Sequence, residues 1–85
     1  MREFVTGTEY ELMTTASVMQ FQNVGGGTLV VKRAATQPAA SEFGWKYKDG
    51  FGERGHLDDL YPTETGSLWA RSDESTVVLV EELAP

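Results

Sequence analysis

Apolar and polar residues alternate through most of this chain, and the alternation predicts strands. Glu9–Leu12 alternates polar and apolar side chains, as a strand with one buried face does. A helix over residues 8–21 is the competing prediction, because Leu12, Ala16 and Met19 would then share one face. The β-branched residues of this stretch lose side-chain freedom in a helix, so we favour the strand.

The clearest predicted unit is a hairpin that begins at residue 17. Residues 17–24 alternate, with Met19 and Phe21 on one face and glutamines on the other. Glycines at 25–27 supply freely available positive φ, and residues 28–33 return as a β-branched run. Two apolar runs around such a turn predict an antiparallel pair.

A second hairpin is predicted near the C-terminus, where a polar turn at 72–75 separates the apolar runs 67–71 and 76–82. Bulky aromatic residues alternate over 43–47 and predict a further strand. Short strands separated by turn residues are typical of sandwiches and barrels. We therefore predict an all-β fold, a small antiparallel β-sandwich or barrel of about six to eight short strands, as one domain over residues 1–85.

Two segments interrupt the strand pattern. Residues 34–41 are mostly small and predict a loop, and residues 49–65 form a long irregular segment rich in glycine. A short helical turn is predicted at Leu57–Leu60, before Pro62. Long connections in compact domains tend to carry function, so both segments are candidate contact regions.

Size and composition limit how such a domain can be stabilised. A chain of 85 residues buries roughly 60–65% of its surface, which leaves little excess stability. The chain has no cysteine and one histidine, which excludes disulfides and thiolate zinc sites and argues against a histidine-rich metal site. Association with identical or different subunits is the remaining route, and no cofactor is expected.

The net charge of −6 argues against two classes of partner. Nucleic-acid binding depends on clustered lysines and arginines, whereas the seven basic residues here are scattered along an acidic chain. Acidity also opposes docking on anionic membranes, and no apolar run is long enough to span one. Met1–Phe4 precedes no apolar segment typical of a secretory signal, so synthesis in a cytoplasm is expected.

One segment matches a nucleotide-binding fingerprint in its letters. Gly50–Gly55 reads G-x-G-x-x-G, and Asp73 follows at about the expected distance. The fingerprint requires its last glycine to open a helix whose N-terminus holds the pyrophosphate. Pro62 leaves room for barely two turns, so we interpret the segment as a glycine-rich surface loop and keep nucleotide binding as an alternative.

Catalytic chemistry has few candidates. His56 lies near Glu53, Asp58 and Asp59 in the sequence, and this group is interpreted as a solvated acidic loop. A calcium ion held by Asp58 and Asp59 is the alternative. Hydroxyl nucleophiles need an oriented base, and no nucleophile-elbow sequence is present, so we do not expect an enzyme.

The aromatic residues are better candidates for binding. We predict contact with a partner protein through Trp45, Tyr47, Phe51, Arg54 and Tyr61, because aromatic and arginine side chains dominate interface energetics. A carbohydrate-binding platform formed by the first three of these residues is the alternative. It requires exposed, coplanar rings.

The order of these elements resembles a known group of proteins. The segments that carry the resemblance are Ser-Val-Met-Gln-Phe-Gln-Asn at 17–23, Leu-Trp-Ala-Arg at 68–71 and Thr-Val-Val-Leu-Val-Glu at 76–81. They resemble the small accessory virion proteins of tailed bacteriophages, which are single β-sandwich domains. The resemblance spans most of residues 8–82 but not the aromatic and acidic segment 43–64.

The resemblance implies a structural role in the virion after synthesis in the host cytoplasm. It implies a capsid decoration, or cement, protein: a homotrimer that binds the major capsid protein and stabilises the head shell. A tail or neck component is the closely related alternative. Such a role needs no catalytic residues.

Overall fold

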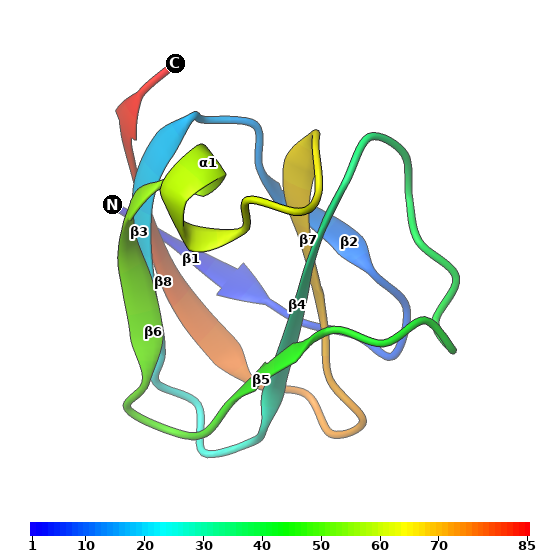
Figure 1. The fold of residues 1–85 in the computed structure, drawn as a ribbon. Helices are drawn as coiled ribbons and strands as arrows, with labels where there is room; N and C mark the ends of the chain where they lie inside the picture. The colour runs from blue at the N-terminus through cyan, green and yellow to red at the C-terminus, as the bar shows by residue number, and fades with distance from the viewer.

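The computed structural model describes residues 1–85 as eight strands and one short helix (Figure 1). In chain order these are β1 (Arg2–Val5), β2 (Glu11–Thr14), β3 (Val18–Asn23), β4 (Leu29–Ala34), β5 (Trp45–Tyr47), β6 (Gly52–His56), α1 (Leu57–Leu60), β7 (Ser67–Arg71) and β8 (Val77–Ala84). The strands form two antiparallel sheets, in the orders β1-β8-β3-β6 and β2-β7-β4-β5. The predicted all-β sandwich is confirmed, and no barrel is closed.

The first four strands pair with the last four in reverse order. β1 pairs with β8, β2 with β7, β3 with β6 and β4 with β5. This antiparallel ribbon is rolled up, so that β3 also pairs with β8 and β4 with β7. Eight strands arranged in this way form a jelly roll. Only the connection from β4 to β5 stays within one sheet.

Both predicted hairpins are wrong. β3 and β4 lie in different sheets, and so do β7 and β8. The connections at Gly25–Gly27 and Ser72–Ser75 therefore carry the chain across the sandwich. A strand that faces another across a core has the same apolar alternation as a strand that pairs with it, so alternation does not distinguish the two arrangements.

Other element predictions hold in part. The helical turn at Leu57–Leu60 is confirmed as α1, whereas β1 was not predicted and β6 lies in the segment expected to be irregular. The alternative helix over residues 8–21 is wrong, because β2 and β3 occupy that stretch. A register shift in β2 between Leu12 and Thr14 leaves Leu12 exposed and buries Met13.

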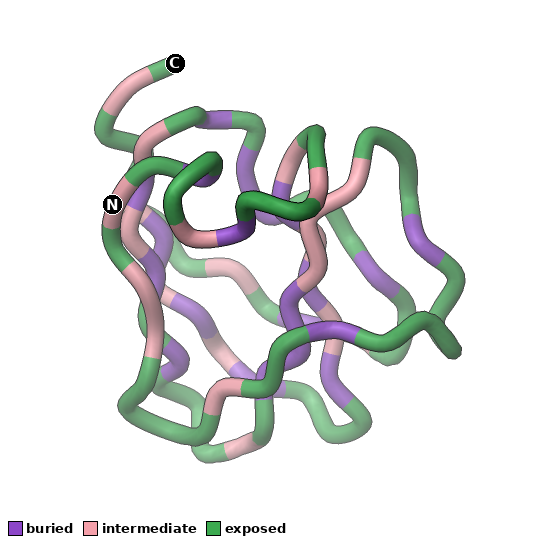
Figure 2. The backbone as a smooth tube through the Cα atoms, in the orientation of Figure 1, coloured by how far each residue is buried: buried purple, intermediate pink, exposed green.

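The core lies between the two sheets, and buried positions alternate with more exposed ones along the central strands (Figure 2). Met19 and Phe21 are buried, as their alternation with glutamines predicts. Twelve buried residues make one cluster: Met13, Ala16, Met19, Phe21, Leu29, Val31, Leu57, Tyr61, Leu68, Ala70, Val78 and Val80.

The connection from β4 to β5 folds back over the outer face of the second sheet. Its Gln37 side chain donates a hydrogen bond to the backbone oxygen of Tyr10, and the Tyr10 hydroxyl donates to the backbone oxygen of Glu42 at 2.9 Å. A Cβ on Gly44 would lie 2.6 Å from that hydroxyl. Tyr10 is therefore fully buried outside the main core, and the loop that covers it is a packed structure.

A buried amide joins the connections at one end of the sandwich. The Asn23 side-chain nitrogen donates to the backbone oxygens of Gly27 (2.6 Å) and Tyr47 (3.0 Å). Its side-chain oxygen accepts a hydrogen bond from the Thr76 hydroxyl at 2.7 Å. The amide thus joins the β3–β4 connection, the end of β5 and the β7–β8 connection.

Hydroxyl groups extend this network to the remaining connection. The Thr6 and Ser72 hydroxyls lie 2.6 Å apart, and the Thr76 backbone N–H donates to the Thr6 hydroxyl at 3.0 Å. All four of these residues, Asn23 included, are buried. One network therefore links the β1–β2, β3–β4, β5–β6 and β7–β8 connections.

Replacing Asn23 by alanine should lower the free energy of unfolding by about 2–4 kcal/mol, because two carbonyls and one hydroxyl lose a partner. Urea unfolding followed by tryptophan fluorescence measures this change. Gln22→Ala is the matched control, because that amide is exposed and donates one hydrogen bond, to Gly50. Equal stabilities of the two variants would refute the structural role of the Asn23 amide.

Candidate interaction surface

The sandwich has two lateral sides, each formed by two edge strands. β1 and β2 form one side, and β5 and β6 form the other, which faces the viewer in Figure 1. Side chains bridge the sheets on both sides: the Arg2 guanidinium donates to the backbone oxygen of Met13, and the Tyr47 hydroxyl donates to the Glu53 carboxylate at 3.1 Å. Each side is therefore a continuous surface that includes residues of both sheets.

Three of the predicted contact residues lie exposed on the β5–β6 side. Trp45 is on β5, Phe51 is in the connection to β6, and Arg54 is on β6. Phe43, which the prediction omitted, is 78% exposed and packs against Trp45, with ring centroids 6.3 Å apart and an interplanar angle of 73°. These aromatic rings are accessible to a partner.

The other two predicted residues point inward. Tyr61 is 4% exposed and belongs to the core cluster, and its hydroxyl lies 2.7 Å from that of Tyr47. The Tyr47 ring packs edge-on against Phe21, with centroids 5.1 Å apart. Both tyrosine side chains lie between the two sheets. Trp45, Tyr47 and Phe51 therefore do not form the coplanar platform that the carbohydrate alternative requires.

Burial changes the acidity of these tyrosines. Desolvation raises the pKa of Tyr47 to about 12, and it raises the pKa of Tyr61 further, with an added contribution from the Tyr47 hydrogen bond. Desolvation also raises the pKa of Tyr10 beneath its covering loop. The folded chain therefore favours the neutral form of each of its three tyrosines.

The structure sorts the scattered basic residues into two groups. Three of them, Lys46, Lys48 and Arg54, form no ion pair, and all three lie on or between β5 and β6. Lys46 and Lys48 line a shallow hollow together with Glu74 without forming a salt bridge. The other four form ion pairs: Arg2–Glu82, Lys32–Glu64, Arg33–Asp58 and Arg71–Asp73.

The opposite side carries unpaired acids. Glu3 on β1, Glu9 before β2 and Glu11 on β2 are exposed and form no ion pair. Val5 and Leu12 lie among them and are 59% and 44% exposed. Sequence reasoning missed this distribution, because it depends on which strands become edges.

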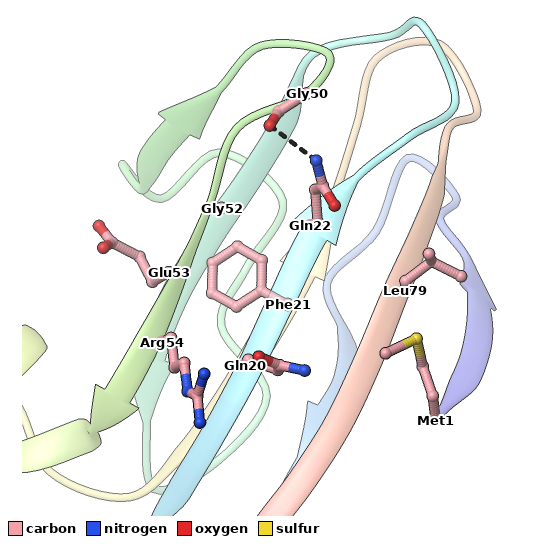
Figure 3. A pocket seen from close by; sticks show the side chains of 9 residues that line it. All are labelled: Met1, Gln20, Phe21, Gln22, Gly50, Gly52, Glu53, Arg54 and Leu79. Atoms are coloured by element: carbon pink, nitrogen blue, oxygen red, sulfur yellow. Dashed lines mark hydrogen bonds between the residues drawn. The ribbon is translucent and has the colours of Figure 1, made fainter.

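A hollow lies on the outer face of the first sheet (Figure 3). Gln20 and Gln22 of β3, Arg54 of β6 and Leu79 of β8 line it, and Met1 lies at its rim. Gln20 donates to the Glu81 carboxylate at 2.6 Å. Amides and a guanidinium equip this hollow for hydrogen bonding, and its side chains include no nucleophile paired with a base.

The glycines of the fingerprint-like segment have structural roles. Gly50 has a φ of +88° in the turn before β6, and a Cβ on Gly52 would clash with the backbone oxygen of Phe21 on the neighbouring strand. Gly55 lies inside β6 and opens no helix. The helix that follows has four residues, so the context required for pyrophosphate binding is missing.

The acidic residues near His56 do not gather into a ligand set. Asp58 pairs with Arg33 at 2.8 Å, and no group of three or more His, Asp or Glu side chains comes together that could hold a metal ion. The calcium alternative therefore has no ligand cluster in this structure. None of the helices has the length and apolar character needed to cross a membrane.

Comparisons with family models, with characterised proteins and with solved structures find no match for this chain. Its function must be argued from the fold and the surfaces.

Titration of the tyrosines tests the closed β5–β6 side. Because folding raises all three pKa values, the folded chain should show little tyrosinate absorbance at pH 10, where about half of unfolded tyrosine is ionised. The stabilisation that the folded chain gains by burying neutral tyrosines is complete below about pH 10. It is lost as the pH rises toward 12, the raised pKa of Tyr47. Absorbance at the tyrosinate band, in buffer and in urea, measures this. Half-ionisation of the folded chain at pH 10 would contradict the buried geometry.

Proposed function

We propose that this chain is a structural subunit of a tailed-phage virion: a head decoration protein that associates with itself, as a homotrimer, and binds the capsid shell. The observation that carries the proposal is the exposed, packed pair of Phe43 and Trp45, with Phe51 exposed further along the same side of the sandwich. Large apolar side chains gathered on the surface of a small domain mark sites of protein contact.

Two further observations support the proposal. Viral capsid domains are among the proteins that use the jelly roll, although fold alone does not determine function. The resemblance to accessory virion proteins rests on residues 17–23, 68–71 and 76–81, most of which form β3, β7 and β8. These strands are the inner frame of the sandwich, which leaves the edge strands free to vary with the partner.

The geometry favours a protein partner over a glycan. Lectins also use the jelly roll, but a sugar platform needs exposed, coplanar rings. The rings of Phe43 and Trp45 are inclined at 73°, and Tyr47 is turned into the sandwich. A projecting edge-to-face pair is instead suited to insertion into an apolar pocket of a partner protein.

The composition of purified virions tests the proposal. Mass spectrometry of gradient-purified particles, from a culture that expresses this gene natively, should find the chain at a copy number comparable to that of the major capsid protein. A copy number far below that of the capsid protein would favour the tail or neck alternative. Absence from the particles would refute the proposal.

Phe43→Ala/Trp45→Ala should weaken binding to head shells stripped of this protein by about 30-fold or more, because aromatic anchors dominate interface energies. Sedimentation with the shells measures the affinity. Leu83→Ala is the matched control, because Leu83 is an exposed apolar residue at the end of β8, away from the aromatic group. Equal loss in both variants would contradict docking through the β5–β6 side.

A further inference from the structure

The hollow on the outer face of the first sheet includes a position that cannot carry a side chain (Figure 3). It lies over the row of the sheet in which Gln22 of β3 pairs with Leu79 of β8 and with Gly52 of β6. A Cβ on Gly52 would lie 1.8 Å from the backbone oxygen of Phe21, so only glycine fits there. The hollow encloses about 370 Å³, which is within the range of small-molecule sites.

Two glutamine amides in the hollow have an orientation that their partners determine. The Gln20 nitrogen donates to the Glu81 carboxylate at 2.6 Å, and the Gln22 nitrogen donates to the backbone oxygen of Gly50 at 3.0 Å. Both partners can only accept a hydrogen bond, so the nitrogen of each amide must face its partner. The two side-chain oxygens accept no hydrogen bond within the chain, and they are therefore free to accept one from a ligand.

Arg54 places hydrogen-bond donors beside these acceptors. It lies opposite Gln20 on the neighbouring strand β6 and forms no ion pair. Glu81 lies opposite Gln20 on the other neighbouring strand, and Glu53 precedes Arg54 with its carboxylate bound by Tyr47. Both carboxylates stay negatively charged. An anion would meet these carboxylates and a cation would meet the guanidinium, so an uncharged ligand fits the hollow best.

An apolar flank completes the hollow. Leu79 of β8 lines this flank, and Met1 lies at the rim with 73% of its surface exposed. A matching ligand has hydroxyl groups, which both donate to the glutamine oxygens and accept from the guanidinium. It also has a face of C–H groups that packs on the apolar flank. A pyranose ring combines these features in one small molecule.

An extended peptide fits this place less well, because β3 is an inner strand of the sheet. Its backbone pairs with β8 on one side and with β6 on the other, and the hollow lies over it between these two strands. Peptides that add a strand bind at the edge of a sheet, where backbone groups are unpaired. The hollow therefore offers side-chain recognition without a backbone ladder.

We propose that this hollow binds an uncharged hexopyranose unit. The Gln20 and Gln22 oxygens accept hydrogen bonds from its hydroxyls, and the Arg54 guanidinium donates to them. Leu79 packs on its C–H face. A single sugar that makes these few contacts should bind with a dissociation constant on the order of 1 mM.

Titration with methyl glycosides tests the site. The probes are the methyl glycosides of glucose, galactose, mannose and N-acetylglucosamine, and proton–nitrogen correlation spectra of the whole chain are the readout. At least one probe should shift the side-chain amide signals of Gln20 and Gln22. Arg54→Ala should weaken that binding by about 10-fold or more, because the sugar loses a charged hydrogen-bond donor. Arg54 makes no ion pair in the chain, so its replacement should leave the fold intact.

Lys46→Ala is the matched control. Lys46 is also an exposed cation without an ion pair, but it lies on β5 in the other sheet, so this variant should bind the probe as the unchanged chain does. Equal loss in the two variants would overturn the inference. So would the absence of any amide shift at about ten times the expected dissociation constant. Shifts confined to the Trp45 indole would place the sugar on the aromatic pair, and tighter binding of methyl glucuronide, which carries a carboxylate, would exclude an uncharged ligand. Either result would also overturn the inference.

The site lies apart from the aromatic pair and goes beyond the proposed function, so the outcomes for the two proposals are separable. Sugar binding by a chain that is absent from virions would refute the virion role and leave the sugar site intact. A chain that is present at high copy number in purified particles but binds none of the probes would refute the sugar site and leave the virion role intact.

Discussion

The buried amide of Asn23 is the constraint on which the rest of the structure depends. In a jelly roll the ladders hold strands within each sheet, but the connections cross between sheets and have no ladder of their own. The amide binds the β3–β4 and β5–β6 connections, and Thr76 links it through Thr6 to the remaining two. Asn23, Thr6, Ser72 and Thr76 are all buried, so the side chains of this group depend on one another for hydrogen bonds. Together with the backbone hydrogen bonds between the same connections, the network holds this end of the sandwich closed.

Fixing the sheets also defines the lateral sides. The backbone oxygen of Tyr47 is bound by Asn23, and the Tyr47 hydroxyl reaches Glu53 and Tyr61. The backbone of Tyr47 is therefore bound to the buried network, and its side chain is bound to residues that lie between the two sheets. Trp45 lies two residues earlier on the same strand, so the backbone that carries its exposed ring is held in place. An ordered backbone reduces the entropy that a binding event would cost at this position.

Sequence reasoning found what depends on local pattern and missed what depends on pairing. The alternation around Met19 and Phe21 and the helical turn at Leu57–Leu60 follow from periodicity and from Pro62. Both hairpins were wrong because crossing the sandwich preserves the alternation of each strand. β6 was missed because its glycines weaken the strand pattern, although one of them is required by close contact with β3. The inward turn of Tyr47 and Tyr61 and the charge of each side depend on tertiary position, which no short window of sequence contains.

The exposed edge strands and the small size both limit the stability of the isolated chain, and binding of a partner would offset both. An 85-residue sandwich without disulfides has little excess stability, and its four edge strands expose unpaired backbone groups. The outermost pairing joins Arg2 to Val80, so one edge of the fold closes only when both ends of the chain meet. A partner that covered one of these edges would also bury the apolar residues exposed beside it. Binding of a partner would therefore stabilise the same edges that the isolated chain leaves exposed.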